Sequence, residues 1–192
     1  MTTPKIILFN APPRAGKDTG ADYVTERLHL YNPANLKLAA VLKDMTHRLY
    51  GLGNIKFNHF EDVKDQPRAE FLGITPRDAY INVAEKLLKP VHGQTIFSEM
   101  LIKQIKALPD QTDVVVISDL GFQQEIDYFA TQFDNNDLLV VQIERDGCDY
   151  SKDSRETVKV PNTVQSYILQ NNSTLDKYYE DLEIVIDHVI KT

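Results

Sequence analysis

Three short apolar runs constrain the fold of this chain more than any other feature of its sequence. They cover residues 5–9, 114–117 and 138–143. Continuous runs of this kind are typical of strands that are buried on both faces of a sheet. Helical patterns separate the runs, and a further short strand is predicted near residues 166–169. Strands that alternate with helices indicate an α/β fold, in which helices cover both faces of a central, mostly parallel sheet.

Helical patterns fill most of the remaining chain. Thr75 and Pro76 form a typical helix start, with threonine as the N-cap and proline at the first position. We expect this helix to end before Pro90, because proline lacks the backbone N–H that a helix interior uses. Residues 51–75 mix glycine, proline and charged residues, which indicates a long connection. The helices are predicted over residues 17–28, 36–50, 76–89, 95–107, 122–132 and 174–190.

Length and charge limit the classes of protein to which the chain can belong. Its 192 residues suffice for one sizeable core, so we expect a single domain over residues 1–192. The net charge of −7 argues against broad binding to nucleic acids or anionic membranes. The single cysteine, Cys148, excludes an intramolecular disulfide. No apolar run reaches the roughly 20 residues of a membrane span, and we expect a cytoplasmic protein without a signal peptide.

Residues 11–19, Ala-Pro-Pro-Arg-Ala-Gly-Lys-Asp-Thr, are the most informative segment. They follow a predicted strand and open a predicted helix, which is the context of a phosphate-binding loop. Backbone N–H groups of such a loop, together with a helix N-terminus, bind phosphate oxygens. Gly16 lets the backbone approach closely, and Lys17 supplies a positive charge for the β- and γ-phosphates.

The loop differs from the general G-x-x-x-x-G-K-[ST] pattern at both ends. Ala11 stands where the first glycine is usual, and Asp18 stands where a Mg²⁺-binding serine or threonine is usual. Asp18 would hold the ion directly or through water, or Thr19 would take part. The competing interpretation is a proline-rich turn that contains a glycine–lysine pair and binds nothing.

Residues 14–24 resemble the opening of the phage-type deoxynucleoside monophosphate kinases, in which such a loop is followed by Ala-Asp and an apolar pair. Later segments resemble the same family in order: Leu-Ala-Ala-Val-Leu-Lys-Asp at 38–44, Thr-Pro-Arg-Asp at 75–78, Val-Val-Ile-Ser-Asp at 115–119, and Asn-Asn-Ser-Thr-Leu at 171–175. The family commonly has arginine two residues after the strand-end aspartate, where this chain has Gly121. The resemblance implies a three-layer P-loop kinase fold, ATP and Mg²⁺ as cofactors, and a nucleoside monophosphate as the phosphoryl acceptor.

Site residues follow from the loop, the resemblance and the predicted topology. Asp119 ends a predicted strand, at the sheet edge where open α/β folds bind ligands, although it could instead cap the helix at 122–132. Phosphoryl transfer needs cations around the phosphates. We predict catalytic roles for Lys17, Arg14, Asp119 and Arg77; cofactor binding by Pro13, Arg14, Ala15, Gly16, Lys17, Asp18, Thr19, Arg145 and Asn171; metal binding by Asp18, Thr19 and Asp119; and substrate binding by Lys43, Arg68 and Arg77. Plain solvation or surface ion pairing is the competing interpretation for Lys43, Arg68 and Arg77.

Two regions are expected to complete the enzyme. Residues 51–93 would bind the acceptor, and the charged stretch 145–163 would form a lid over ATP, with a solvated loop as the alternative. The predicted activity is ATP-dependent phosphorylation of deoxynucleoside monophosphates, in a host cytoplasm if a phage encodes the chain. The alternatives are a P-loop kinase for another small molecule and a nucleotide-binding regulatory module without kinase activity. The predicted partner is a small-molecule nucleotide rather than nucleic acid or a membrane, and a homodimer is left open.

Overall fold

The computed structural model describes residues 3–151 and 153–191. The chain divides into two compact units. We call the described residues up to Leu36 and from Gln104 onward the sheet unit, and Lys37–Lys103 the helical unit. The predicted acceptor region, 51–93, falls inside the helical unit. That residues 1–192 act as one domain, and that 51–93 binds an acceptor, stay predictions.

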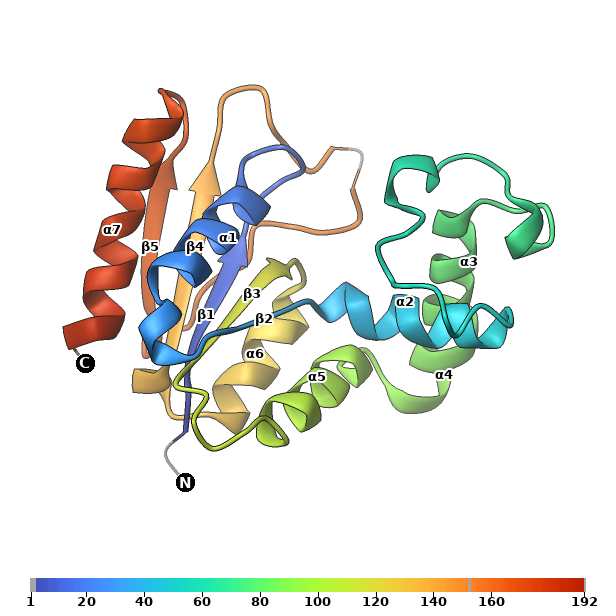
Figure 1. The fold of residues 1–192 in the computed structure, drawn as a ribbon, viewed down its shortest axis with the longest axis horizontal. Helices are drawn as coiled ribbons and strands as arrows, with labels where there is room; N and C mark the ends of the chain where they lie inside the picture. The colour runs from blue at the N-terminus through green and yellow to red at the C-terminus, as the bar shows by residue number, and fades with distance from the viewer. Residues whose placement is uncertain (1–2, 152, 192) are drawn as a thin grey trace. The chain divides into compact units, whose positions relative to one another are not determined.

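The sheet unit is built on five parallel strands in the order β2-β3-β1-β4-β5, as Figure 1 shows. They are β1 (Lys5–Asn10), β2 (Ala34–Leu36), β3 (Val114–Leu120), β4 (Leu138–Glu144) and β5 (Gln165–Gln170). β1 lies at the centre between β3 and β4, so the segment that follows β1 emerges at the middle of the carboxyl edge. The predicted strands are confirmed, and β2 is a strand that the sequence did not indicate.

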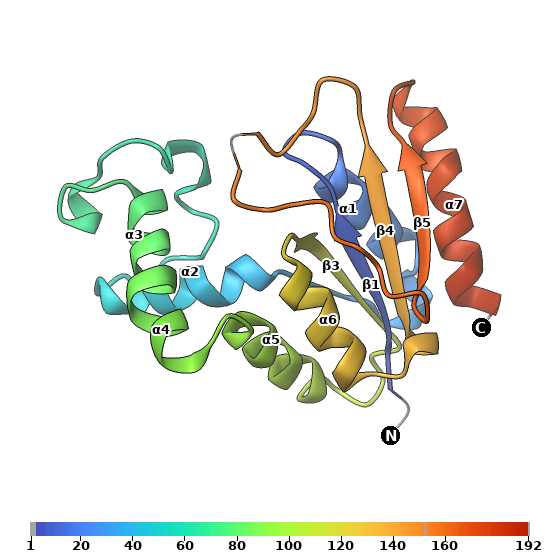
Figure 2. The same ribbon diagram turned by 180° about the vertical axis from the view of Figure 1, so that it is seen from behind.

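Helices cover both faces of this sheet. Alternate strand residues such as Ile7 and Phe9 pack with α1 (Lys17–Arg27) and α7 (Leu175–Lys191) in one buried cluster. The intervening residues Ile6 and Leu8 are equally buried and point to the opposite face, where Figure 2 shows α6 (Gln123–Gln132). The strands are therefore buried on both faces, as their continuous apolar runs predicted, and the three-layer α/β fold is confirmed.

The helical unit contains α2 (Leu38–Leu49), α3 (Pro76–Asn82), a π-helix (Val83–Leu88) and α4 (Lys89–His92), and α5 (Ile96–Lys106) begins in it. Its core is a cluster of four buried residues, Phe60, Phe71, Ala79 and Tyr80. The connection at 51–75 contributes two of these residues and contains only short 3₁₀ turns, at Glu61–Val63 and Ala69–Phe71. The connection is thus held in place by buried side chains at points along its length.

The prediction that a helix ends before Pro90 was wrong. Thr75 caps α3 as expected, since its side chain accepts a hydrogen bond from the backbone N–H of Asp78. Helical backbone then continues through the π-helix into α4 and ends at His92. Pro90 lies in the first turn of α4, where the missing N–H of proline breaks no helical hydrogen bond of that segment.

Candidate phosphate-binding site

The loop that joins β1 to α1 has an unusual backbone. Arg14 and Gly16 both have positive φ, of 68° and 106°. For Arg14 this left-handed conformation is strained, and such strain persists only where surrounding contacts hold it. A methyl group on Gly16 would lie 2.5 Å from Nδ2 of Asn171. Glycine is therefore required at position 16 both by the backbone and by the side chain packed against it.

Side chains from distant parts of the sheet unit hold the carbonyl groups of this loop. Nη1 of Arg145 donates to the Arg14 carbonyl oxygen at 3.4 Å. Nδ2 of Asn171 donates to the Ala15 carbonyl oxygen at 2.9 Å. The Tyr178 hydroxyl donates to the Gly16 carbonyl oxygen at 3.1 Å. The predicted residues Arg145 and Asn171 thus lie at the loop, and Tyr178 is a third contact that the sequence did not indicate.

These contacts determine where the loop amides point. No peptide bond in the described residues is cis, and a trans peptide directs its C=O and N–H to opposite sides. The N–H groups of Gly16 and Lys17 therefore point away from Asn171 and Tyr178. α1 begins at Lys17, so its first-turn N–H groups add to the same donor set. Several backbone donors thus lie on the same side of the loop, and such an arrangement is suited to binding an anion.

Charged groups next to these amides belong to Lys17 and Asp18. The Lys17 side chain is only 12% exposed, and its Nζ lies 3.3 Å from Oδ2 of Asp18. The other carboxylate oxygen of Asp18 accepts a hydrogen bond of 3.1 Å from the buried Ser118 hydroxyl on β3. Ser118 is a site residue that sequence reasoning missed, although it directly precedes Asp119. An oxygen pair of this kind, with phosphate oxygens, fits the hard ligands that Mg²⁺ prefers.

Other predicted loop residues lie in different surroundings. Pro13 is half-buried, Ala15 is buried, and Arg14 is exposed. Thr19, a predicted metal ligand, lines a hollow beside α1 and α7 together with Asp22, Tyr23, Glu26, Arg27, His29 and Tyr179. Among the residues that the structure describes, no group of three or more His, Cys, Asp or Glu side chains could hold a metal ion. Metal binding by Asp18, Thr19 or Asp119 stays a prediction.

Asp119 is the second-last residue of β3 and is half-buried. It does not cap α6, whose N-terminal residue is preceded by Phe122. Instead, the Glu125 carboxylate accepts hydrogen bonds from the backbone N–H groups of Gly121 and Phe122, at 2.9 and 3.0 Å. The alternative role that we considered for Asp119, as a helix cap, was wrong.

Arg155 lies beside Asp119 and fills the space above Gly121. A methyl group on Gly121 would meet three side-chain carbons of Arg155 at 2.4 to 2.9 Å. Arg155 forms a two-point ion pair with Asp153, with Nε–Oδ1 and Nη2–Oδ2 distances of 2.9 and 2.5 Å. The hydrogen bond to Asp153 raises the pKa of Arg155, and the negative charge of Asp119 acts in the same direction. The phage-type kinases that the sequence resembles commonly have arginine at the position of Gly121. In this chain, an arginine from the charged stretch lies next to Gly121 instead.

The predicted lid, residues 145–163, is anchored to the sheet. Asn10 is buried at the end of β1, and its Nδ2 donates to the Leu120 and Glu156 carbonyl oxygens, both at 3.0 Å. The same nitrogen lies 3.2 Å from the Tyr150 hydroxyl, and burial raises the pKa of Tyr150 to about 12. Oδ1 of Asn10 accepts from the backbone N–H of Val158 at 3.1 Å. Lys152 lies outside the described residues, and closure over a ligand stays a prediction.

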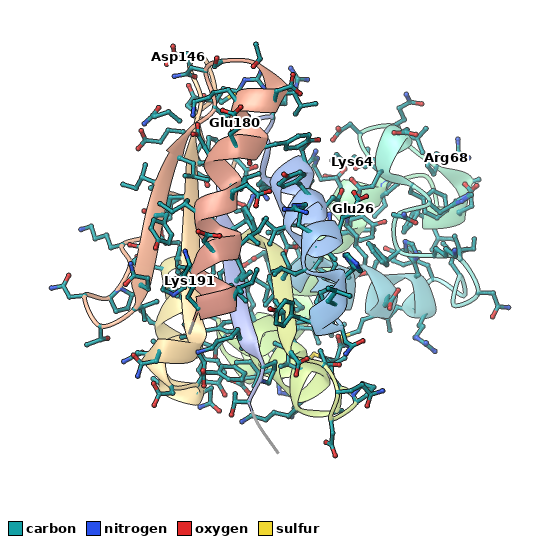
Figure 3. All side chains as sticks on the ribbon, turned by 60° about the vertical axis from the view of Figure 1, so that its left-hand side comes forward. Glu26, Lys64, Arg68, Asp146, Glu180 and Lys191 are labelled. Atoms are coloured by element: carbon teal, nitrogen blue, oxygen red, sulfur yellow. The ribbon has the colours of Figure 1, made fainter. Side chains whose placement is uncertain are left out.

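The predicted acceptor-binding cations all have acidic partners within the helical unit, where Figure 3 labels Lys64 and Arg68. Lys43 pairs with Glu61, Arg68 with Glu70 at 3.0 Å, and Arg77 with Asp65 at 2.5 Å. Burial alone would raise the pKa of Glu61, but hydrogen bonds and charges from Lys43 and Lys64 hold that pKa below its ordinary value. The ion pairs match the competing interpretation of these residues, and substrate binding by them stays a prediction.

Comparisons with known proteins identify the fold. No protein-family model matches the chain, and no curated protein sequence matches it. A solved structure described as a "putative kinase" from Chloroflexus aurantiacus is similar, with a TM-score of 0.53, 10% sequence identity, and coverage of 97% of this chain and 99% of that one. At this low identity the likeness concerns the fold alone. The chain therefore has an α/β fold similar to that of the Chloroflexus aurantiacus protein. Among the described residues, every helix is too short or too polar to cross a lipid bilayer.

Proposed function

We propose that this protein is a kinase that uses ATP and Mg²⁺ to phosphorylate deoxynucleoside monophosphates. One observation carries the nucleotide-binding part of the proposal. Asn171 and Tyr178 hold the carbonyls of Ala15 and Gly16, so the amides of Gly16 and Lys17 point to the opposite side. The P-loop kinase-like fold and the family motifs support phosphoryl transfer, and the motifs alone support the acceptor class.

The proposed roles follow the geometry of the sheet unit. The amides of Gly16 and Lys17 and the Lys17 ammonium bind the ATP phosphates, and Arg14 neutralises charge at the exposed side of the loop. Asp18, together with the Ser118 hydroxyl, would hold Mg²⁺, which when bound offsets charge on the β- and γ-phosphate oxygens. The acceptor phosphate is itself the nucleophile, so no strong general base is required. Asp119, with Arg155 near it, would act on the transferred group.

A kinase for another small-molecule acceptor is the second candidate. It is favoured by the ion pairs of Lys43, Arg68 and Arg77, because a cation already paired with a carboxylate is poorly suited to bind a phosphate dianion. Under this alternative the phosphate loop works as proposed, and only the acceptor differs.

Coupled measurement of ADP release with ATP, Mg²⁺ and each of the four deoxynucleoside monophosphates tests the proposal. We expect turnover that depends on the acceptor and falls by at least about a hundredfold in Lys17→Met, because the charge on the phosphates is then uncompensated. Lys177→Met on α7 is the matched control, since this exposed lysine pairs only with surface acids in the described structure. Acceptor-dependent turnover with other small molecules only would favour the second candidate. ATP binding with no turnover would favour a regulatory module.

A further inference from the structure

Two side chains near the C-terminal helix fit closely against the beginning of α1. Tyr178 is buried, with 1% of its surface exposed, and its hydroxyl reaches the Gly16 carbonyl oxygen. A methyl group on Gly20 would lie 2.3 Å from that hydroxyl oxygen. Asn171 fits against Gly16 in the same way, at 2.5 Å from the position of a methyl group. Two glycines thus leave room for two hydrogen-bond donors.

The two donors differ in what else orients the peptide that each one holds. The Gly16 carbonyl oxygen also accepts the first hydrogen bond of α1, from Gly20 N–H at 2.9 Å. Helix geometry therefore fixes the Gly16–Lys17 peptide together with Tyr178. The Ala15–Gly16 peptide precedes the helix, and its carbonyl oxygen accepts a hydrogen bond of 2.9 Å from the Asn171 amide. Asn171 thus orients the Gly16 amide, which helix geometry does not fix.

The direction of these hydrogen bonds separates positioning from ligand binding. The Asn171 amide nitrogen is committed to the Ala15 carbonyl oxygen, and the Tyr178 hydroxyl donates its single hydrogen to Gly16. Burial raises the pKa of Tyr178 above its ordinary value, so the hydroxyl keeps that hydrogen at neutral pH. Both groups lie on the carbonyl side of the loop, opposite to the amides that would meet a phosphate.

We infer that Asn171 and Tyr178 are positioning residues that preorganise the Gly16 and Lys17 amides for a polyphosphate, so that residues of the C-terminal segment set the phosphate affinity of the loop. This inference rests on the proposed function in needing a phosphate ligand, and it assigns Asn171 a role other than direct cofactor binding. Without the two donors the loop would still exist, but the Gly16 amide would sample other orientations and the Lys17 amide would be held by helix geometry alone. Preorganised donors bind more tightly because the ligand does not have to order them.

The test compares Asn171→Leu and Tyr178→Phe with the wild-type protein, using calorimetric titration with inorganic tripolyphosphate and with ATP, both with Mg²⁺. Each variant should weaken binding of both ligands by about three- to tenfold, the effect of one hydrogen bond. The loss should be equal for the two ligands. Tripolyphosphate lacks the nucleoside, so an equal loss shows that the affected contacts are those to the phosphates. Tyr179→Phe is the matched control: its ring stacks on Tyr23 at 4.1 Å and is not the one that reaches the loop.

A spectroscopic measurement distinguishes positioning from general stability. In the wild-type protein, tripolyphosphate should shift the Gly16 amide proton resonance downfield, and in Asn171→Leu this shift should be smaller.

Gly20→Ala provides a second test of Tyr178, because it displaces the Tyr178 hydroxyl without removing it. Its effect on affinity should resemble that of Tyr178→Phe. The Gly20→Ala/Tyr178→Phe double variant should lose less affinity than the sum of the two single losses, because both changes remove the same hydrogen bond.

The outcomes separate the two proposals. If the wild-type protein binds neither ATP nor tripolyphosphate, the proposed function fails. If it binds both and the Asn171 and Tyr178 variants bind within twofold of it, with an unchanged Gly16 resonance shift, this inference is overturned while the proposed function stands. Equal weakening of both ligands in these variants, with Tyr179→Phe unaffected, supports the inference.

Discussion

Gly16 is the residue at which backbone conformation and packing act together. Its φ of 106° and the 2.5 Å approach of Asn171 both exclude a larger residue. Gly16→Ala should lower the free energy of unfolding by more than about 1 kcal/mol and abolish ATP binding at millimolar concentration. Gly51→Ala is the control, because Gly51 also has positive φ but open space around it. Equal losses of stability in the two variants, measured by urea unfolding, would contradict the packing argument.

Gly121 makes room for a single arginine. Because its methyl substituent would meet Arg155 side-chain carbons at 2.4 to 2.9 Å, Gly121→Ala should destabilise the protein by about 1–3 kcal/mol. Removing the obstructing side chain should relieve this cost. A double-mutant cycle with Arg155→Ala tests the point: the double variant should be more stable than the sum of the two single effects. Strict additivity would show that the two residues do not share the space.

Glu61 should make stability depend on acid pH. Its pKa is held below the ordinary 4.5 by Lys43 and Lys64, against the effect of burial. A carboxyl group whose folded pKa is lowered stabilises the protein above its unfolded pKa, and this contribution is lost as the pH falls through the folded pKa. Below about pH 4.5 the wild-type protein should therefore lose stability more steeply than Glu61→Gln. Urea unfolding at pH 7, 5, 4 and 3 measures this loss of stability, with the exposed Glu180→Gln as the control. Parallel curves of unfolding free energy against pH for wild type and Glu61→Gln would refute the prediction.

Single residues also mark the limit of what sequence predicts at the site. The predicted position of the loop, between a strand and a helix, is confirmed, because sequence patterns of this kind reflect local backbone geometry. Phosphate binding by Gly16 and Lys17 stays a prediction. Ser118 and Tyr178 were missed, since each meets the loop from a different strand or helix. Arg155 was noticed only as part of a charged stretch. Its position next to Gly121 depends on where residues 145–163 pack against the sheet, and no local sequence pattern predicts this.

At the scale of elements, Asn10 joins β1 to the charged stretch that follows β4. Asn10→Leu keeps the number and branching of side-chain heavy atoms but leaves the Val158 N–H and the Glu156 and Leu120 carbonyls without this partner. We expect a loss of at least about 2 kcal/mol of stability, because unsatisfied buried groups are costly. Limited trypsin digestion should then cut faster after Arg155 or Lys159 than in wild type. Asn35→Leu, at an exposed position on β2, is the control, and unchanged cleavage in Asn10→Leu would show that the anchor does not hold the stretch.

Elements differ in how far sequence predicts them. The runs that form β1, β3 and β4 were confirmed, because strands buried on both faces need uninterrupted apolar residues. β2 is only Ala34–Leu36, and its pairing with β3 rather than its composition makes it a strand. Local sequence rules also did not predict that helical backbone continues past Pro90. The π-helix Val83–Leu88 changes the hydrogen-bond register before the proline.

At the scale of the whole molecule, the fold was predictable and the acceptor was not. Alternating strands and helices lead to few arrangements, and the parallel sheet with helices on both faces is one of them. In our proposal the acceptor is bound by the helical unit, whose cations Lys43, Arg68 and Arg77 are paired with acids there. A motif can show that such cations are present, but it cannot show whether carboxylates already neutralise them.

Ligand binding should be visible in the stability of the whole protein. A ligand present at 100 times its dissociation constant adds about 2.7 kcal/mol to the free energy of unfolding. ATP with Mg²⁺ should therefore raise the melting temperature of the wild-type protein measurably. Adenosine at equal concentration should raise it far less, because the loop offers its amides and Lys17 to phosphates. A shift of the same size with adenosine would place the main binding contacts elsewhere.

The central claim is that the loop of residues 11–19 holds a triphosphate whose γ-phosphoryl group passes to a nucleoside monophosphate. ³¹P NMR of the protein with ATP, Mg²⁺ and a mixture of the four deoxynucleoside monophosphates tests this most directly. We predict that ADP and a deoxynucleoside diphosphate appear in equal amounts and that Lys17→Met forms neither. If ATP stays intact, or is hydrolysed to ADP and free phosphate without a new diphosphate, the claim that this protein is a deoxynucleoside monophosphate kinase is contradicted.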